Sequence, residues 1–152
     1  MRLSTLTAAV VTLALSVAAG PLGAQNTAAP ASAPPRSACA EVDARGSCTL
    51  YSVSIIQLIA RPELFDGRRV RVIGYLWLEF EGNAIYLTEA DQKHGLTKNG
   101  LWVGFARGTL EPGREYSGHY VLIEGTFRAD RHGHMGLWSG TLENITRATV
   151  WR

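Results

Sequence analysis

The chain has 152 residues, of which 46% are hydrophobic and 18% charged, with 15 Lys and Arg against 13 Asp and Glu. This length suits one domain with a substantial core and is too short for two ordinary domains. The near balance of charge counts against a polyanion-binding protein, because such proteins usually carry a clear basic excess on one face.

Residues 1–24 have the pattern of a secretory signal peptide. Arg2 is followed by an apolar stretch of about 15 residues, shorter than the ~20 that span a bilayer. Leu22-Gly23-Ala24 then offers small residues for cleavage after Ala24. The alternative is a retained membrane anchor, which the short stretch disfavours. We therefore expect a periplasmic or secreted protein with no membrane span after cleavage.

Residues 25–47 are expected to form a flexible linker that carries a disulfide. The stretch from Gln25 to Ala38 is rich in Ala, Pro, Ser and Thr, and it cannot bury enough apolar surface to offset the entropy of ordering. Cys39 and Cys48 are the two cysteines of the chain, and in an exported protein such a pair predicts a structural disulfide. A redox-active pair or a metal site is the alternative, but the spacing is not Cys-x-x-Cys. The folded domain is expected over residues 48–152.

A short helix is predicted over residues 52–60. Ser52 or Ser54 can cap its N-terminus, and apolar side chains recur on one side of it. Pro62 is expected to end it, because the residue before a proline is pushed out of the α region.

A long strand is predicted over residues 68–80, where apolar and mixed positions alternate. One face is assigned to the core, and its members are Val70, Val72, Leu76, Leu78 and Phe80. Gly74 lies in the middle, where a strand that serves two sheets of a barrel bends or bulges. A tight turn is expected at Gly82-Asn83.

Further strands are predicted over residues 84–88, 101–105, 119–129 and 134–142, followed by a closing segment at 145–151. Residues 89–95 are expected to contain one helical turn, Lys98-Asn99-Gly100 to be a turn and residues 108–118 a loop. Gly125 is a second candidate bend. The core positions expected from these strands are Ile85, Leu87, Leu101, Val103, Phe105, Val121, Ile123 and Phe127. An all-β, five-stranded small barrel with a short N-terminal helix is therefore predicted.

Three stretches resemble bacterial OB-fold domains. Residues 62–74 (PELFDGRRVRVIG) are similar to the entry of that fold, where a short helix leads into a bent first strand. Residues 119–127 resemble its fourth strand, and residues 139–145 its closing strand. The region 50–152 as a whole resembles a group of uncharacterised exported bacterial proteins. The resemblance implies an OB-fold-like barrel and says little about the ligand, because OB-folds host many functions.

A candidate binding face lies on the outer side of the first three strands. The alternation sends four aromatic side chains there: Tyr75, Trp77, Tyr86 and Trp102. OB-folds generally bind ligands on this side, and aromatic rings stack on bases, sugars or partner side chains. Arg71 is included as a ligand-binding candidate from the same strand face. The alternative is that the N-terminal helix or the loop at 108–118 covers the rings.

Charges near this face favour a protein or cell-wall-type glycan over a nucleic acid. Carboxylates are expected to cluster at one end of the face (Glu79, Glu81, Glu89 and Asp91), where they would repel phosphates. Arg68, Arg69 and Arg71 keep single-stranded nucleic acid as a second hypothesis, which requires affinity that falls steeply with salt.

A metal-dependent enzyme that uses His119, His132 and His134 is the third hypothesis. Imidazoles two residues apart point the same way on a strand, but His132 is expected in an exposed turn. The sequence contains no Gly-x-Ser-x-Gly elbow, no glycine-rich phosphate loop and no His-Glu-x-x-His. We therefore predict a non-catalytic exported binding module without a cofactor or a metal.

Overall fold

The computed structural model describes residues 33–104 and 113–152. The helices within them are α1 (Ile55–Ala60), α2 (Pro62–Phe65) and α3 (Glu89–Lys93). The strands are β1 (Cys39–Val42), β2 (Cys48–Ser52), β3 (Arg69–Trp77), β4 (Ala84–Tyr86), β5 (Gly100–Val103), β6 (His119–Arg128) and β7 (Thr141–Val150). None of the helices in these two ranges is long and apolar enough to cross a membrane.

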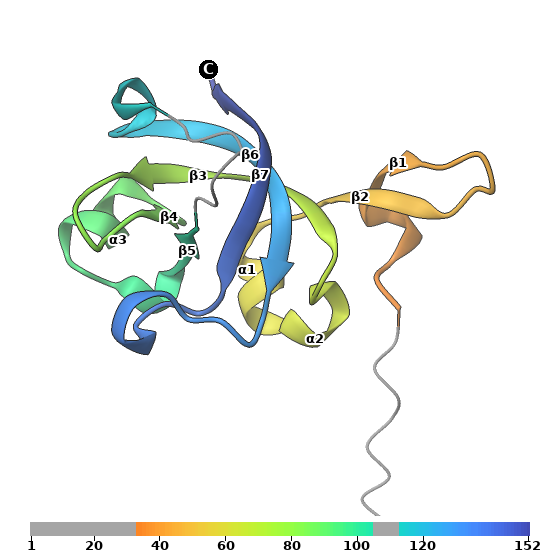
Figure 1. Cartoon of the computed structure of the whole chain (residues 1–152), viewed down its shortest axis with the longest axis horizontal. Coiled ribbons are helices and arrows are strands. Elements are labelled where there is room, and N and C mark those ends of the chain that lie inside the picture. Colours follow the sequence, from red (N-terminus) through yellow and green to blue (C-terminus); the bar gives the residue numbers. More distant parts are fainter. Residues whose placement is uncertain (1–32, 105–112) are drawn as a thin grey trace, which may run out of the picture.

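The strands form a closed barrel with a hairpin attached to one side. The sheet order is β1-β2-β3-β4-β5-β7-β6, and β6 pairs again with β3, which closes a barrel of five strands. Within the barrel β5 and β7 are parallel, and the other neighbours are antiparallel. The predicted all-β, OB-fold-like class is confirmed. Figure 1 shows the β1–β2 hairpin extending from the barrel.

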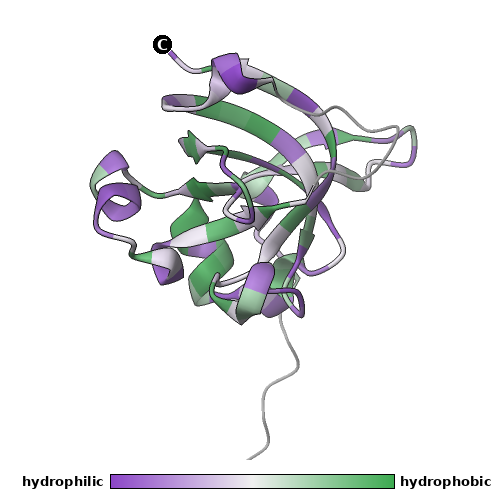
Figure 2. Cartoon of the chain, turned by 60° about the vertical axis from the view of Figure 1, so that its left-hand side comes forward, coloured by the Kyte–Doolittle hydropathy of each residue, from purple (hydrophilic) through white to green (hydrophobic). Residues whose placement is uncertain are grey.

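The barrel interior is filled by the aliphatic side of the alternating strands. Val70, Val72 and Leu76 of β3 are almost fully buried, as predicted. So are the expected core residues Ile85, Leu101, Val103, Val121, Ile123 and Phe127, while Leu78 and Leu87 pack partly buried against them. In Figure 2 green bands alternate with white and purple ones along the barrel strands. Hydrophobic burial along β3, β4, β5, β6 and β7 therefore defines the core.

Two glycines let strands approach each other closely inside the barrel. A Cβ on Gly74 would lie 2.6 Å from the carbonyl oxygen of Tyr86 and 2.7 Å from Cδ1 of Ile55. The β3–β6 register does not shift at Gly74, so of the predicted bend or bulge the bulge is absent, and close packing accounts for the glycine. At Gly125 the register of β6 against β7 does shift. The bulging residues lie on β7, where Asn144 has a φ of 51°.

The N-terminal helix begins later than predicted, and Ser54 is its cap. The Ser54 hydroxyl accepts a hydrogen bond from Gln57 N, and the Gln57 side chain accepts one from Ser54 N, which is a capping box. α1 ends at Ala60, before Pro62, as expected. The proline then starts α2 at its first position, where its missing N–H costs nothing.

α3 confirms the helical turn expected at residues 89–95. The Thr88 hydroxyl accepts a hydrogen bond from Asp91 N at 3.1 Å and caps the helix. The buried Asp91 carboxylate accepts hydrogen bonds from Asn99 Nδ2, at 2.7 Å, and from the Thr88 hydroxyl. These hydrogen bonds, that from Asn99 first, hold the pKa of Asp91 below its usual range. Asp91 thus fastens α3 to the turn that precedes β5.

The predicted disulfide between Cys39 and Cys48 is present and joins β1 to β2. β1 and its turn lie within the segment 25–47 that the sequence predicts as linker, and they pair antiparallel with β2. β2 in turn pairs in parallel with β3 at Tyr51 and Ser52. The disulfide fits an oxidising, non-cytoplasmic compartment.

The predicted end of the first long strand and the predicted start of the last strand are wrong, and Phe80 is misplaced by the first of these errors. β3 ends at Trp77 and residues 78–83 form the loop to β4, so Phe80 is 92% exposed instead of buried. The tight Gly82-Asn83 turn is replaced by this longer loop, in which Asn83 Oδ1 accepts a hydrogen bond from Glu79 N. The last strand begins at Thr141 instead of His134, because the preceding glycines form a loop. Phe105 lies outside the described residues.

Candidate aromatic binding site

The outer side of β3, β4 and β5 carries a second apolar cluster, separate from the barrel core. Ala84, Tyr86 and Trp138 are buried in it, and Trp77 and Trp102 pack partly buried against them. The strand register explains the assembly, because Ala84 pairs with Trp77 on one side and Trp102 on the other. We call these five residues the aromatic cluster.

Small residues between the rings make room for them. Ala84 separates the two tryptophans across the sheet and is fully buried. Gly100 pairs with Tyr86, and a Cβ there would lie 3.0 Å from Cδ1 of the Tyr86 ring. A larger side chain at Ala84 or Gly100 would therefore lift the rings off the strands.

The connection between β6 and β7, residues 129–140, covers the aromatic cluster. Trp138 is 4% exposed and packs edge-on against Trp102, with 4.9 Å between ring centroids. Gly133 has a φ of 66°, and a Cβ there would lie 2.6 Å from the Trp102 ring. The backbone thus lies directly on that ring, at a position that only glycine occupies without strain.

Hydrogen bonds fasten this covering segment to the turn before β5. Lys98 Nζ donates to the carbonyl oxygens of Gly136 and Trp138, at 3.3 and 3.4 Å. The Ser139 hydroxyl donates to the Lys98 carbonyl oxygen at 2.7 Å. Trp138 Nε1 is buried and makes no hydrogen bond of ordinary geometry among the described residues, but it lies near enough to the Tyr86 hydroxyl to act on the pKa of that phenol.

Two segments form the rims of the site, the β6–β7 connection and the loop at residues 78–83. Trp77 Nε1 donates to Glu79 Oε2 at 3.0 Å, which fixes the ring against the loop. Glu81 has a φ of 57°, and its carboxylate lies 3.6 Å from His134 Nε2 of the covering segment. Phe80 and Met135 project from the two loops and are 92% and 80% exposed. The two rims therefore meet beside the tryptophans and present apolar side chains to solvent.

The structure brings Trp77, Tyr86 and Trp102 together as the sequence suggests, with different exposures. Tyr86 is buried, and burial raises the pKa of its phenol. The tryptophans are half-buried. The rings thus share the non-core side of the strands. The β6–β7 connection covers Trp102, and α1 does not cover the rings. Of the loop at 108–118 only residues 113–118 are described, and its Gly118 lies beside Trp77, where an added Cβ would be 3.9 Å from Cζ3 of that ring.

Tyr75 and Arg71 lie apart from the aromatic cluster. Tyr75 is buried against Tyr120, with 5.6 Å between ring centroids. Burial, and then the Glu89 carboxylate, raise the pKa of Tyr75. Arg71 pairs with the carboxylates of Glu124 and Glu41. Neither side chain is free to contact a ligand at the tryptophans.

The histidines singled out by the sequence are not gathered into one site. His132 Nδ1 lies 3.1 Å from the Trp138 carbonyl oxygen, His134 faces Glu81, and His119 begins β6. Across residues 33–104 and 113–152 no group of three or more His, Cys, Asp or Glu side chains is placed to hold a metal ion.

Sequence reasoning missed Trp138, Phe80 and Met135. Trp138 was placed in a strand, and the signal against that assignment is the glycine pair at 133 and 136, both with positive φ.

Comparisons of the chain with protein-family models, with curated proteins and with solved structures found no match.

Proposed function

We propose that the chain is a non-catalytic binding module of the bacterial envelope that recognises a protein partner at the aromatic site. The observation that carries this proposal is the pair of exposed apolar side chains, Phe80 and Met135, on loops that meet beside Trp77 and Trp102. An exposed aromatic ring with an apolar surround is typical of protein interfaces. The expected signal peptide and the disulfide support an envelope location.

The geometry favours a protein over a cell-wall-type glycan. Glycans stack on the flat faces of exposed rings. Here Trp102 is packed under Gly133 and against Trp138, whereas the exposed groups are side chains projecting from loops. Projecting side chains fit into pockets on a protein surface. Glu79 and Glu81 at the rim suit a partner with basic residues at its margin.

The test is a crosslinking pull-down from the native envelope with a Phe80→Ser/Met135→Ser variant. Both side chains are exposed, so the substitutions leave the core intact. Val42→Ser is the matched control, because Val42 is 63% exposed on the distant hairpin. The wild type and the control should recover the same partner, and the double variant should recover about tenfold less.

Equal recovery by the double variant, with unchanged thermal unfolding, would remove the proposal. Sedimentation with purified cell-wall glycan is run alongside. If the glycan binds wild-type protein and Trp102→Phe weakens that binding while the double variant does not, the ligand is a glycan and the protein partner is excluded.

A further inference from the structure

β3, β6 and β7 lie side by side on another side of the barrel, and their alternate residues form one outer surface. The register sets three rows across these strands. The first row is Arg71, Glu124 and Arg147, the second Ile73, Leu122 and Thr149, and the third Tyr75, Tyr120 and Trp151. Arg69, Thr126 and Glu143 form a further row beside the first. In the third row Trp151 N donates to the Tyr120 carbonyl oxygen at 2.8 Å. We call this surface the β3–β6–β7 face.

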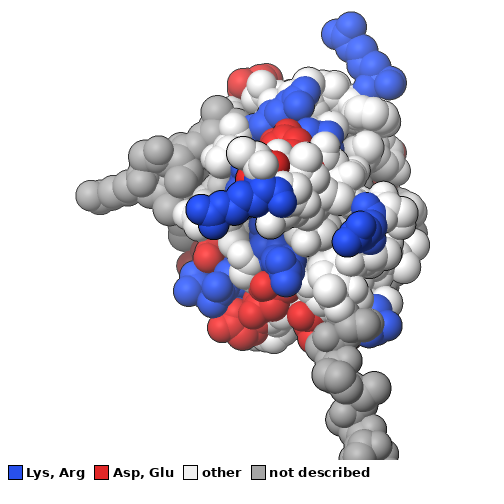
Figure 3. Space-filling model, turned by 90° about the vertical axis from the view of Figure 1, so that its right-hand side faces the viewer, with Lys and Arg blue, Asp and Glu red and all other residues white. Residues whose placement is uncertain are grey.

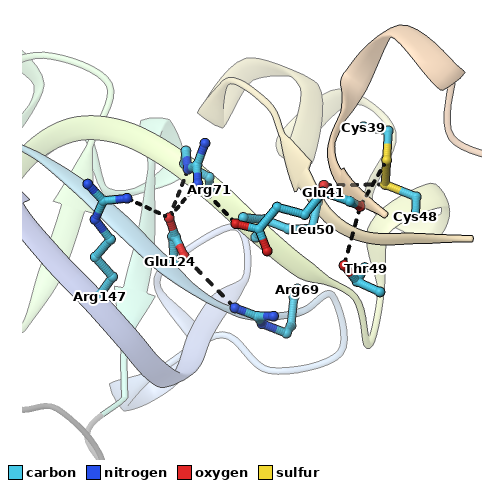
Figure 4. Close-up of polar contacts among 9 residues, drawn as sticks. All are labelled: Cys39, Glu41, Cys48, Thr49, Leu50, Arg69, Arg71, Glu124 and Arg147. Carbon is cyan, nitrogen blue, oxygen red and sulfur yellow. Dashed lines mark hydrogen bonds and ion pairs between the residues drawn. A yellow bond between two sulfur atoms is a disulfide. The ribbon is translucent and has the colours of Figure 1, made fainter. Parts of the chain in front are cut away.

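One half of this face is rich in arginine, with Arg69, Arg71 and Arg147 placed around the carboxylates of Glu124 and Glu41. The Glu124 side chain is only 7% exposed, and its Oε1 accepts hydrogen bonds from Arg71 Nε at 2.9 Å and Arg147 Nη1 at 3.3 Å. Arg69 Nη2 lies 3.9 Å from Oε2, and Glu41 of the hairpin lies 3.5 Å from Arg71. Figure 4 shows these guanidinium groups gathered around the Glu124 carboxylate.

The arginines carry more donors than the two carboxylates use. Arg69 and Arg147 side chains are 43% and 52% exposed. Arg147 donates one N–H to Glu124, and within the described residues Arg69 makes no hydrogen bond to Glu124. A guanidinium has five N–H groups. A buried carboxylate surrounded by arginines is often no more stabilising than apolar packing. The stability of the fold alone therefore does not explain why these arginines gather around Glu124.

The other half of the face is apolar and exposed. Ile73, Tyr120 and Trp151 are 39%, 41% and 52% exposed in the adjoining rows. The Tyr120 hydroxyl accepts a hydrogen bond from Glu89 N at 3.4 Å, so α3 borders this end. Figure 3, seen from the side that carries the hairpin, shows charged side chains separated by wide uncharged areas.

We propose that the β3–β6–β7 face docks on a lipid bilayer with anionic headgroups. The strength with which a protein face binds the membrane interface grows with the apolar area it buries and with its electrostatic attraction to anionic lipids. Apolar side chains and arginines lie here on one continuous face. Tyr and Trp suit the membrane interface because one end of each ring system is apolar and the other polar. An acidic soluble chain would use Arg69 and Arg147 and leave Trp151 without a role.

Vesicle co-sedimentation tests this proposal with equimolar phosphatidylglycerol and phosphatidylcholine, and with phosphatidylcholine alone. The protein should sediment with the anionic vesicles, and less so as salt shortens the Debye length. An Arg69→Gln/Arg147→Gln variant should bind roughly 30-fold more weakly, from about 1 kcal/mol per arginine near an anionic surface. Arg61→Gln is the matched control, because Arg61 has a similar exposure and lies on the α1–α2 corner.

Trp151→Ala tests the apolar half, since it keeps every charge. It should also reduce sedimentation, and the wild-type fluorescence should shift to shorter wavelength with anionic vesicles and not in this variant. The Phe80→Ser/Met135→Ser variant should bind vesicles as the wild type does, which separates this proposal from the proposed function.

Three outcomes would overturn the docking proposal. The first is no sedimentation with anionic vesicles at low salt. The second is an equal loss of binding in the Arg61→Gln control. The third is binding to soluble polyglutamate that is as strong as binding to vesicles and insensitive to Trp151→Ala, which would assign the arginines to an acidic soluble partner.

Discussion

Replacing Gly74 by alanine tests whether close packing holds β3, β4 and α1 together. The added Cβ would lie 2.6, 2.7 and 2.8 Å from Tyr86 O, Ile55 Cδ1 and Ile85 Cγ1. Tyr86 O is a backbone atom of the neighbouring strand and cannot rotate away. Overpacking costs about 1–3 kcal/mol, and three contacts under 3 Å, one of them with a backbone atom, put Gly74→Ala at the upper end of that range. Relief of the glycine's chain entropy offsets about 0.5–1 kcal/mol. We expect Gly74→Ala to destabilise the protein by about 2 kcal/mol.

Thermal unfolding followed by circular dichroism measures this effect. For a domain of this size about 2 kcal/mol lowers the Tm by roughly 8 °C. Gly104→Ala is the control, because among the described residues the nearest atom to its added Cβ is 3.7 Å away, an ordinary contact. If Gly74→Ala melts at or above the wild-type Tm, or no lower than Gly104→Ala, then contact with Tyr86 and Ile55 is not why glycine is needed.

Three further changes test other parts of the structure. Because hydrogen bonds lower the pKa of Asp91 in the folded protein, its contribution to stability is full above the unfolded pKa and is lost as pH falls through the folded pKa. Urea midpoints of Asp91→Asn should therefore fall below wild type at neutral pH and approach it in acid, and a pH-independent difference would contradict this. Cys39→Ser/Cys48→Ser should speed amide hydrogen exchange in β1. It should lower the free energy of unfolding of the barrel by less than the ~2–3 kcal/mol expected for a disulfide that constrains a whole domain. Uniform acceleration across the barrel would contradict it. Glu124→Gln should cost about 2 kcal/mol in urea unfolding, because it leaves Arg71 without its nearest carboxylate, and an unchanged midpoint would show that Glu41 suffices.

The fold was predictable where alternation runs along a strand with one buried side. In β3 and β6 the period of two places Val70, Val72, Val121 and Ile123 correctly, because a slip of one residue would turn an aliphatic row to solvent. The disulfide was predictable because the chain has one pair of cysteines.

Strand ends were less predictable, because alternation can continue by chance into a loop. Phe80 is in phase with Leu76, but backbone pairing of β3 with β4 stops at Trp77. Alternation along β3 does not report the length of its partner strand β4, which is only three residues long. Similarly, the residues before Thr141 carry glycines with positive φ that fit no strand.

The site was half predictable. The alternation along each strand identifies which rings point away from the barrel core, and Trp77, Tyr86 and Trp102 do lie together on that outer side. What covers them depends on the path of the β6–β7 connection, and therefore on long-range contacts such as those between Lys98 and the backbone of Gly136 and Trp138. Single-sequence periodicity does not report such contacts.

The place of β7 has a consequence for the order in which the molecule is assembled. This last strand lies between β5 and β6 and makes a parallel ladder with one and an antiparallel ladder with the other. A growing chain therefore keeps the edges of β5 and β6 unpaired until β7 has been synthesised, and unpaired strand edges invite intermolecular pairing. Chaperones that bind nascent chains should accordingly bind this protein until a late stage of its synthesis. Truncation before Thr141 should yield aggregates instead of a smaller soluble barrel.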